Sequence, residues 1–195
     1  MVELNMLGAA FAEAVNMDEE TFNLSIPYWK LKAYKKGEFY NEYHSVCKHL
    51  GFILEGVFRI YRADDTTGEE KNMLFFSNGQ FVTSYTSFLS QKPCNYYTAS
   101  VDASLVLYIH IDNLSKLYHE SHQWDRFGRY IAENAFHQLM GNTEGFLFMS
   151  AEERYIEMMK AHPDIFNSVP LYHLASYLGI KAPSLSRIRK RMVGK

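Results

Sequence analysis

Residues 181–191 place five cationic side chains beside small and hydroxyl-bearing residues, a mixture suited to binding nucleic acid. The planar guanidinium of Arg187 can bond both acceptors on the major-groove edge of guanine, so we expect it to read a base. Lys181, Lys190 and Arg191 are better suited to phosphates, which supply affinity without sequence information. The predicted contact residues for double-stranded DNA are Lys181, Ala182, Pro183, Ser184, Ser186, Arg187, Lys190 and Arg191.

Two short helices joined by a tight turn would position these side chains. Ala175 is small where two helices would cross, and Gly179 suits a turn that needs a left-handed backbone conformation. Pro183 favours the start of a new helix, because its missing N–H is not needed in a first turn. Leu185 and Ile188 are three residues apart and would face inward. The pattern predicts a helix-turn-helix unit whose second helix enters a major groove.

The charge of the chain is unevenly distributed. Residues 150–195 carry eight Lys or Arg against four Asp or Glu, whereas residues 1–149 carry twelve against eighteen. This asymmetry suits a small nucleic-acid-binding module joined to a second domain. A basic helical hairpin can also be an ordinary solvated surface, or part of a small-molecule-binding or protein-interaction module whose helical end docks a protein partner. A steep loss of duplex DNA binding with salt would favour the first interpretation.

The amino-terminal two thirds of the chain have a different amino-acid composition. Residues 28–111 are rich in aromatic and β-branched residues, with turn-forming pairs at intervals of roughly ten residues. This predicts an antiparallel β sandwich or roll, preceded by a helix over residues 4–15. His44, His49 and Glu55 suggest a metal-dependent β-roll enzyme. However, a separation of five residues sends the two histidines to opposite faces of a strand, so we expect no metal, no cofactor and no catalytic site.

The cysteines and the amino terminus bear on the compartment. Cys47 and Cys94 are not a closely spaced pair, and two free buried thiols are the expected state. The amino terminus has no basic flank of the kind that precedes a secretory signal. No segment approaches the roughly 20 apolar residues needed to span a bilayer. These features predict a cytoplasmic protein with no membrane partner.

A long helix is expected over residues 123–149, because apolar residues recur there at steps of three and four. One stripe contains Trp124, Phe127, Ile131, Ala135, Leu139, Asn142 and Phe146. A second, weaker stripe contains Phe136, Met140 and Leu147. Two apolar faces need two partners, so one face should cover the roll and the other should meet a second subunit. We assign the dimer interface to the first stripe; the alternative is that both faces are buried within one monomer.

A new helix is predicted after the long one. Ser150 and Glu153 have the spacing of a capping box, in which each side chain bonds the backbone N–H of the other residue. The helix should begin at about Ala151 and end before Pro163. The predicted division is a β roll with an amino-terminal helix over residues 1–122, a dimerisation helix over residues 123–149, and a helix-turn-helix domain over residues 150–195.

The order of these parts resembles the Crp/Fnr superfamily of bacterial transcriptional regulators. The most specific segments are YKKGEFYNEY and FILEGVFRIY in the roll, AEERYIEMM after the long helix, and VPLYHLASYLGIKAPSLSRIRK at the end. The resemblance covers nearly the whole chain and implies an α+β fold, with a jelly roll of the cyclic-nucleotide-binding type, a dimerisation helix and a winged-helix-like DNA-binding domain. It also implies a homodimer on two half-sites roughly 34 Å apart, with RNA polymerase as a further partner.

The chain departs from the relatives that bind cyclic AMP. Their pocket has a glutamate for the ribose and an arginine for the cyclic phosphate, where this chain has Ser84 and Tyr97. Loss of the arginine removes a charge-assisted bidentate contact, so we expect no tight cyclic AMP binding. The cavity either admits an unidentified small molecule or is filled by aromatic side chains. Its expected lining is Phe81, Ser84, Tyr85, Thr86, Tyr97 and Thr98.

The second helix of the helix-turn-helix unit departs from the relatives as well. Many of them place Arg and Glu at its start as base readers, whereas this chain has Ala182 and Pro183 there. Ser184 and Arg187 keep the matching residue types. We therefore expect a different half-site, with a larger share of recognition from phosphates or DNA shape.

Overall fold

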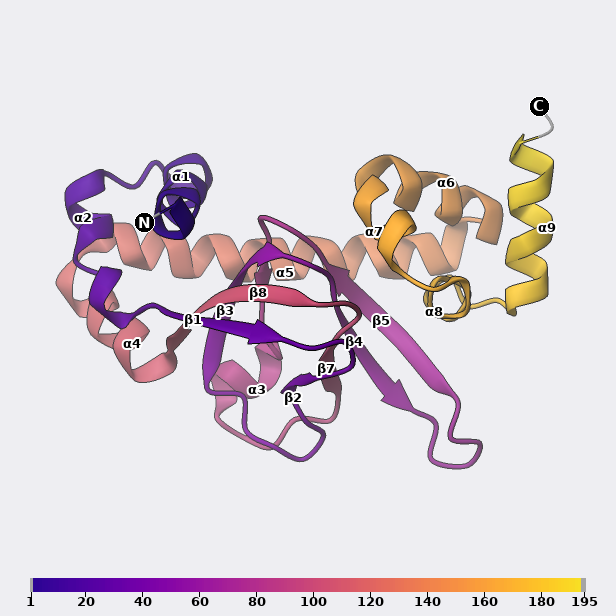
Figure 1. Cartoon of the computed structure of the whole chain (residues 1–195), viewed down its shortest axis with the longest axis horizontal. Coiled ribbons are helices and arrows are strands. Elements are labelled where there is room, and N and C mark those ends of the chain that lie inside the picture. Colours follow the sequence, from indigo (N-terminus) through magenta and orange to yellow (C-terminus); the bar gives the residue numbers. More distant parts are fainter. Residues whose placement is uncertain (1, 194–195) are drawn as a thin grey trace.

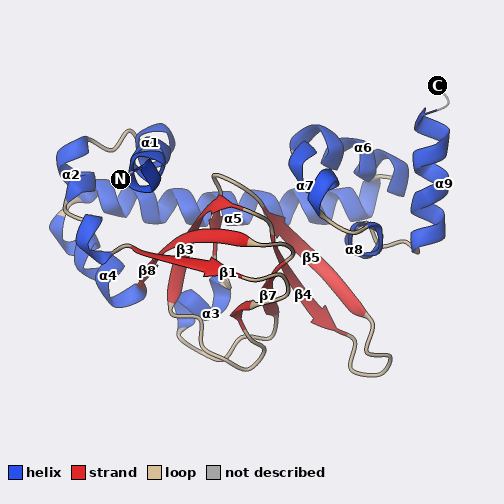
Figure 2. Ribbon diagram, viewed as in Figure 1, coloured by secondary structure: helices blue, strands red, loops and turns tan. Residues whose placement is uncertain are grey.

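The computed structural model describes residues 2–193, so residues 1, 194 and 195, at the outer ends of the first and third predicted parts, lie outside it. Figure 1 shows a β roll and a group of carboxyl-terminal helices arranged along one long helix. The roll is made mainly of strands, and helices precede and follow it in the sequence (Figure 2). The α+β class predicted from the sequence is confirmed. Among the described residues, no helix is long and apolar enough to cross a membrane.

The elements follow one another in the predicted order. Helices α1 (Val2–Val15) and α2 (Glu19–Asn23) and a 3-10 turn (Ile26–Tyr28) precede the roll. The roll contains β1 (Lys30–Tyr34), β2 (Phe39–Asn41), β3 (His49–Glu55), β4 (Phe58–Ala63), β5 (Glu70–Phe76), β6 (Phe81–Val82), α3 (Tyr85–Ser90), β7 (Tyr97–Ser100) and β8 (Ser104–His110). It is followed by α4 (Ile111–Glu120), α5 (His122–Phe148), α6 (Ala151–Ala161), α7 (Pro163–Ser168), α8 (Leu171–Tyr177) and α9 (Ala182–Val193).

The roll consists of two four-stranded antiparallel sheets. One has the strand order β1-β8-β3-β6 and the other β2-β7-β4-β5. Side chains alternate between the two faces of each strand, so every second residue can point between the sheets. The buried hydrophobic cluster of this interior contains Tyr34, Ile53, Phe58, Val82 and Val106. The predicted antiparallel roll is therefore confirmed.

The amino-terminal half of α5 is buried against α1 and the roll. Trp124 and Phe127 are fully buried, and the ring of Phe11 on α1 lies 5.0 and 4.4 Å from their ring centroids. Phe52 and Leu107 of the first sheet belong to the same hydrophobic cluster. The prediction that Trp124 and Phe127 face a second subunit is wrong, because α1 already covers this part of α5.

The carboxyl-terminal half of α5 leaves an apolar surface open to solvent. The rest of the first stripe is half-buried or exposed: Ile131, Ala135, Leu139, Asn142 and Phe146. The second stripe is the more exposed, with Phe136, Met140 and Leu147 at 62%, 42% and 69% of their full exposure. Leu139 adjoins this stripe and is 53% exposed. We call Phe136, Leu139, Met140 and Leu147 the exposed face of α5.

The helix α6 begins at the predicted capping box. The Ser150 hydroxyl accepts from the Glu153 backbone N–H at 3.2 Å, and the Glu153 carboxylate accepts from the Ser150 backbone N–H at 2.8 Å. The helix ends at Ala161, before Pro163 starts α7, as predicted. The two residues between Phe148 and Ala151, where the helical conformation is interrupted, separate α5 from the carboxyl-terminal helices.

The core of the carboxyl-terminal helices is continuous with the roll. Val57, Phe75 and Val101 of the roll share one buried cluster with Leu174 of α8 and Leu185 of α9. In addition, α8 packs along β5. The interruption at Ser150 therefore separates α5 from α6, but hydrophobic packing still joins the carboxyl-terminal helices to the roll. A domain boundary at Ser150 stays a prediction.

Candidate nucleic-acid interface

The two helices α8 and α9 form the predicted helix-turn-helix unit. Gly179 in the turn has a φ of +69°, and a Cβ there would lie 3.1 Å from the Phe146 ring. Both facts favour glycine, because a side chain would strain the backbone and crowd that ring. Leu185 and Ile188 are buried, as their spacing predicted. Pro183 is in the first turn of α9, where no backbone N–H donor is required.

The structure brings the predicted DNA-contact residues together on the outward side of α9. Pro183, Arg187, Lys190 and Arg191 are exposed, and Lys181 is exposed just before the helix. The other three predicted residues, Ala182, Ser184 and Ser186, are half-buried. The Arg187 Nε donates to the Pro183 carbonyl oxygen at 3.4 Å, which places the guanidinium near the first turn. This arrangement can present a basic surface to a nucleic acid.

Two of these cations are paired with carboxylates. The Lys181 Nζ donates to Glu69 Oε1 at 2.8 Å, and the Arg191 Nη2 donates to Glu152 Oε2 at 2.6 Å. The bond from Lys181 also lowers the pKa of Glu69 below its ordinary value. Residue spacing gave no sign of the Glu69 pair, because its members are 112 positions apart and belong to the roll and the helix-turn-helix unit.

A polar cluster, buried at Arg59, Asn72 and His173, joins the roll to α8. The Arg59 guanidinium on β4 bonds Glu70 Oε2 at 2.6 Å, Asn72 Oδ1 at 3.1 Å and His173 Nδ1 at 3.1 Å. The Ser176 hydroxyl donates to the Glu70 carbonyl at 2.7 Å and accepts from the Asn72 backbone N–H at 3.0 Å. We call Arg59, Glu70, Asn72, His173 and Ser176 the docking cluster. The sequence analysis missed it; an arginine between the apolar Phe58 and Ile60 was the available signal.

His173 is held neutral within this cluster. Its pKa is lowered to about 4, mainly by burial and also by the neighbouring Arg59, while Glu70 opposes the shift. Since an arginine always donates, the Nδ1 of His173 must accept and its proton must lie on Nε2. Protonation at Nδ1 would remove this acceptor and place a second cation beside Arg59.

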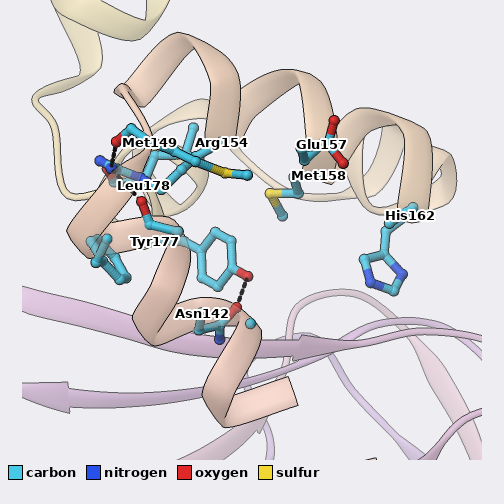
Figure 3. A pocket seen from close by; sticks show the side chains of 12 residues that line it. Asn142, Met149, Arg154, Glu157, Met158, His162, Tyr177 and Leu178 are labelled. Atoms are coloured by element: carbon cyan, nitrogen blue, oxygen red, sulfur yellow. Dashed lines mark hydrogen bonds between the residues drawn. The ribbon is translucent and has the colours of Figure 1, made fainter. Parts of the chain in front are cut away.

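A cavity lies where α5, α6 and α8 meet. It has a volume of about 210 Å³, and Figure 3 shows Asn142, Arg154, His162 and Tyr177 among its lining residues. The Arg154 guanidinium donates to the carbonyl oxygens of Met149 and Leu178, each at 2.7 Å. These carbonyls belong to the ends of α5 and α8, where a cation is favourable. Arg154 thereby links the long helix to the turn of the helix-turn-helix unit.

Asn142 also connects the long helix to its neighbours. Its Oδ1 accepts from the Tyr177 hydroxyl at 3.0 Å, and its Nδ2 donates to the Met73 carbonyl at 3.5 Å. It thus bonds both α8 and β5 from within its own chain. The amide has partners here without a second subunit.

The predicted effector pocket is only partly assembled. Ser84 and Thr98 are buried together, with their hydroxyl oxygens 2.8 Å apart. Phe81 instead packs on Phe11 and Phe127 in the cluster beneath α1, so its predicted place in the pocket is wrong.

The three other predicted pocket residues are Tyr85, Thr86 and Tyr97. Tyr97 stacks on Tyr61 at 5.2 Å, and the Arg59 guanidinium lies 3.7 Å from the Tyr61 ring centroid. Tyr97 therefore shares the face of the second sheet that meets α8, and its predicted place in the interior is wrong. Strand alternation is the reason, since Thr98 points inward. Thr86 is exposed and Tyr85 is half-buried on α3.

Comparison with known proteins identifies the fold. No family model matches the sequence, and no curated protein matches it. Solved structures do. FixK2 from Bradyrhizobium japonicum is 15% identical with a TM-score of 0.72, covering 85% of both chains. The c-di-GMP-responsive regulator CLP of Xanthomonas campestris is 14% identical with a TM-score of 0.69, covering 91% of this chain and 92% of its own.

A third neighbour carries a family name. A transcriptional regulator from Eubacterium rectale, assigned to the Crp/Fnr family, is 14% identical with a TM-score of 0.69 and covers 92% of this chain and 85% of its own. The similarity extends over the roll, the long helix and the carboxyl-terminal helices together. The chain therefore has the fold of the Crp/Fnr regulators, the fold implied by the sequence resemblance.

Proposed function

We propose that this chain is a homodimeric, sequence-specific DNA-binding regulator of transcription and that α9 is its recognition helix. The observation that carries the proposal is the exposed basic surface of α9, held by an inward Leu185 and Ile188 and a glycine turn. Structural neighbours from Xanthomonas campestris and Eubacterium rectale are regulators rather than enzymes, which supports a non-enzymatic role. A contact with RNA polymerase stays a prediction.

Arg187 is the proposed base reader. Selection of bound sequences from a random duplex pool should recover a palindrome with half-sites about one helical turn apart. Arg187→Ala should then cost about 1 to 3 kcal/mol and relax selection at one base position. Arg189→Ala removes the same charge from a neighbouring position and should weaken all sequences about equally. Equal weakening of selected and random DNA by Arg187→Ala would make Arg187 a phosphate contact.

The exposed face of α5 is the proposed dimer contact. This proposal replaces the first stripe, which the sequence analysis had assigned to the dimer interface, because Trp124 and Phe127 of that stripe are buried within the chain. Large apolar side chains that stay exposed along one helix are typical of an interface. We expect the two α5 helices to pair in parallel, because this orientation puts both helix-turn-helix units at the same end of the dimer.

The roll is proposed to have no tight site for cyclic AMP. Ser84 and Thr98 bond each other, and no arginine occupies the position of Tyr97, which lies on the outer face. A calorimetric titration should detect no binding of cyclic AMP at micromolar concentrations. Cyclic di-GMP, named for the Xanthomonas campestris neighbour, is the second nucleotide to titrate. Micromolar or tighter binding of cyclic AMP would contradict the proposal.

A further inference from the structure

The turn between β4 and β5 brings a carboxylate to the edge of the recognition helix. Glu69 accepts from Lys181 Nζ at 2.8 Å. It also lines a cavity of about 290 Å³ together with Tyr172, Ala182 and Pro183, at the first turn of α9. A carboxylate therefore lies beside the cation and the helix start that the proposed function assigns to DNA.

Glu69 differs from the other acidic residues of this turn. The Asp64 carboxylate accepts from the backbone N–H groups of Thr66 and Thr67 and lies within the turn itself. Asp65 pairs with Arg62 of β4 at 2.8 Å. Both aspartates have partners inside the roll, whereas Glu69 reaches across to the helix-turn-helix unit.

The docking cluster holds Glu69 in this position. Glu70, the next residue, receives the Ser176 hydroxyl on its backbone oxygen and the Arg59 guanidinium on its carboxylate. Because Arg59 and His173 are buried, their bonds fix β5 against α8 more firmly than an exposed ion pair could. The approach of Glu69 to Lys181 is thus set by the packing of two elements.

We propose that the β4–β5 turn is an internal competitor of DNA, in which Glu69 holds Lys181 until a phosphate displaces it. The inference rests on the proposed DNA-binding function. Duplex DNA carries one negative charge per roughly 1.7 Å of axis, so a phosphate at Lys181 would be repelled by Glu69. A change that withdraws the turn from α8 would therefore strengthen DNA binding.

Glu69→Gln tests this competition, because it removes the charge and keeps the shape. Asp65→Asn is the matched control, since it removes one charge from the same turn without touching α8. Glu69→Gln should bind duplex DNA about two- to fivefold more tightly at low salt, the range expected for an exposed ion pair, and Asp65→Asn should change affinity by less. Equal effects of both variants, or weaker binding by Glu69→Gln, would overturn the proposal.

Salt dependence and a double variant give two further readouts. Because a phosphate displaces Glu69 from Lys181 in the unaltered protein as well, Lys181 contacts phosphate in both complexes, so Glu69→Gln should change the slope of log affinity against log salt by less than the roughly 0.9 of one phosphate contact, whereas Lys181→Gln should flatten it by about that amount. In a Lys181→Gln background, the gain in affinity from Glu69→Gln should be clearly smaller, and an undiminished gain would overturn the pairing. If neither the unaltered protein nor any variant binds duplex DNA, the proposed function fails and the inference with it. If the unaltered protein and Glu69→Gln bind duplex DNA with equal affinity, only the inference fails.

Discussion

A few buried polar side chains reinforce the hydrophobic contact between the roll and the helix-turn-helix unit. Arg59 and His173 are 8% and 7% exposed, and each would be costly to bury without a partner. Arg59 and His173 bond each other, and Glu70 and Asn72 provide their further partners. These hydrogen bonds exist only while α8 packs on β5. Polar groups of this kind give a packed interface one preferred arrangement.

His173 should make the stability of the protein depend on pH. Its pKa in the folded protein, about 4, lies below the ordinary value of 6.5, so the neutral form stabilises the fold. This contribution is fully present above pH 6.5 and is lost as the pH falls from 6.5 towards 4. Arg59 and Lys36 oppose protonation, and Glu70 favours it. The loss should be about 1 to 3 kcal/mol in the free energy of unfolding.

Urea unfolding at pH 7.5 and pH 5 would measure this loss. His173→Gln cannot be protonated, so its unfolding free energy should fall less between the two pH values than that of the unaltered protein. The remaining fall is expected from His49 and His162, whose pKa values are also lowered by burial. His122→Gln, at an exposed position on α5, is the control and should keep the full dependence. An unchanged dependence in His173→Gln would show that His173 is not the responsible group.

The ends of α5, α6 and α8 determine how the long helix is connected to the helix-turn-helix unit. The long helix stops at Phe148, and α6 begins three residues later because Ser150 and Glu153 cap its first turn. Arg154, one residue further on, bonds the ends of α5 and α8. A short connection with a strong cap leaves few ways to place the helix-turn-helix unit relative to α5.

Removal of the cap should weaken this connection. Ser150→Ala deletes the acceptor for the Glu153 N–H and should lower the free energy of unfolding by about 1 kcal/mol. Ser115→Ala is the matched control, because Ser115 is exposed in the interior of α4, where alanine is the better helix former. Thermal or urea unfolding would compare the two. Equal stability of Ser150→Ala and the unaltered protein would mean that the cap is not a determinant of α6.

The assembled chain leaves one side of its long helix without a cover. The roll, α1 and α4 bury the first half of α5, while the exposed face lies on the second half, beside the carboxyl-terminal helices (Figure 1). The position of this face suits a partner that lies along α5. A second copy whose α5 pairs in parallel would have its recognition helix at the same end of the assembly.

A charge within this face should separate the subunits. Leu139→Glu is expected to weaken dimerisation by about 2 kcal/mol or more, roughly 30-fold, because the carboxylate would be buried without a partner. Sedimentation equilibrium would measure the dissociation constant. Leu89→Glu, at an exposed leucine on α3, is the control and should leave it unchanged. A monomeric unaltered protein, or a Leu139→Glu protein that dimerises normally, would contradict the proposed contact.

The kind and order of the helices and strands could be predicted from the sequence. Turn glycines, the capping box, the proline at the start of α9 and the helical spacing of Leu185 and Ile188 act over a few residues, so their meaning can be read locally. The resemblance to the Crp/Fnr regulators then implied the arrangement that the solved structures share.

Which neighbour each helix or strand face contacts depends on the tertiary packing and could not be predicted from the sequence. A periodic stripe defines a face but not its neighbour, so Trp124 and Phe127 could be assigned to a second subunit although α1 covers them. The alternation of side chains along a strand likewise does not show which set of residues faces the interior, and Tyr97 points out of the roll. The pairing of Glu69 with Lys181 and the bond of Arg59 to His173 join residues more than 100 positions apart. Such contacts depend on how β5 and α8 pack, which no local pattern specifies.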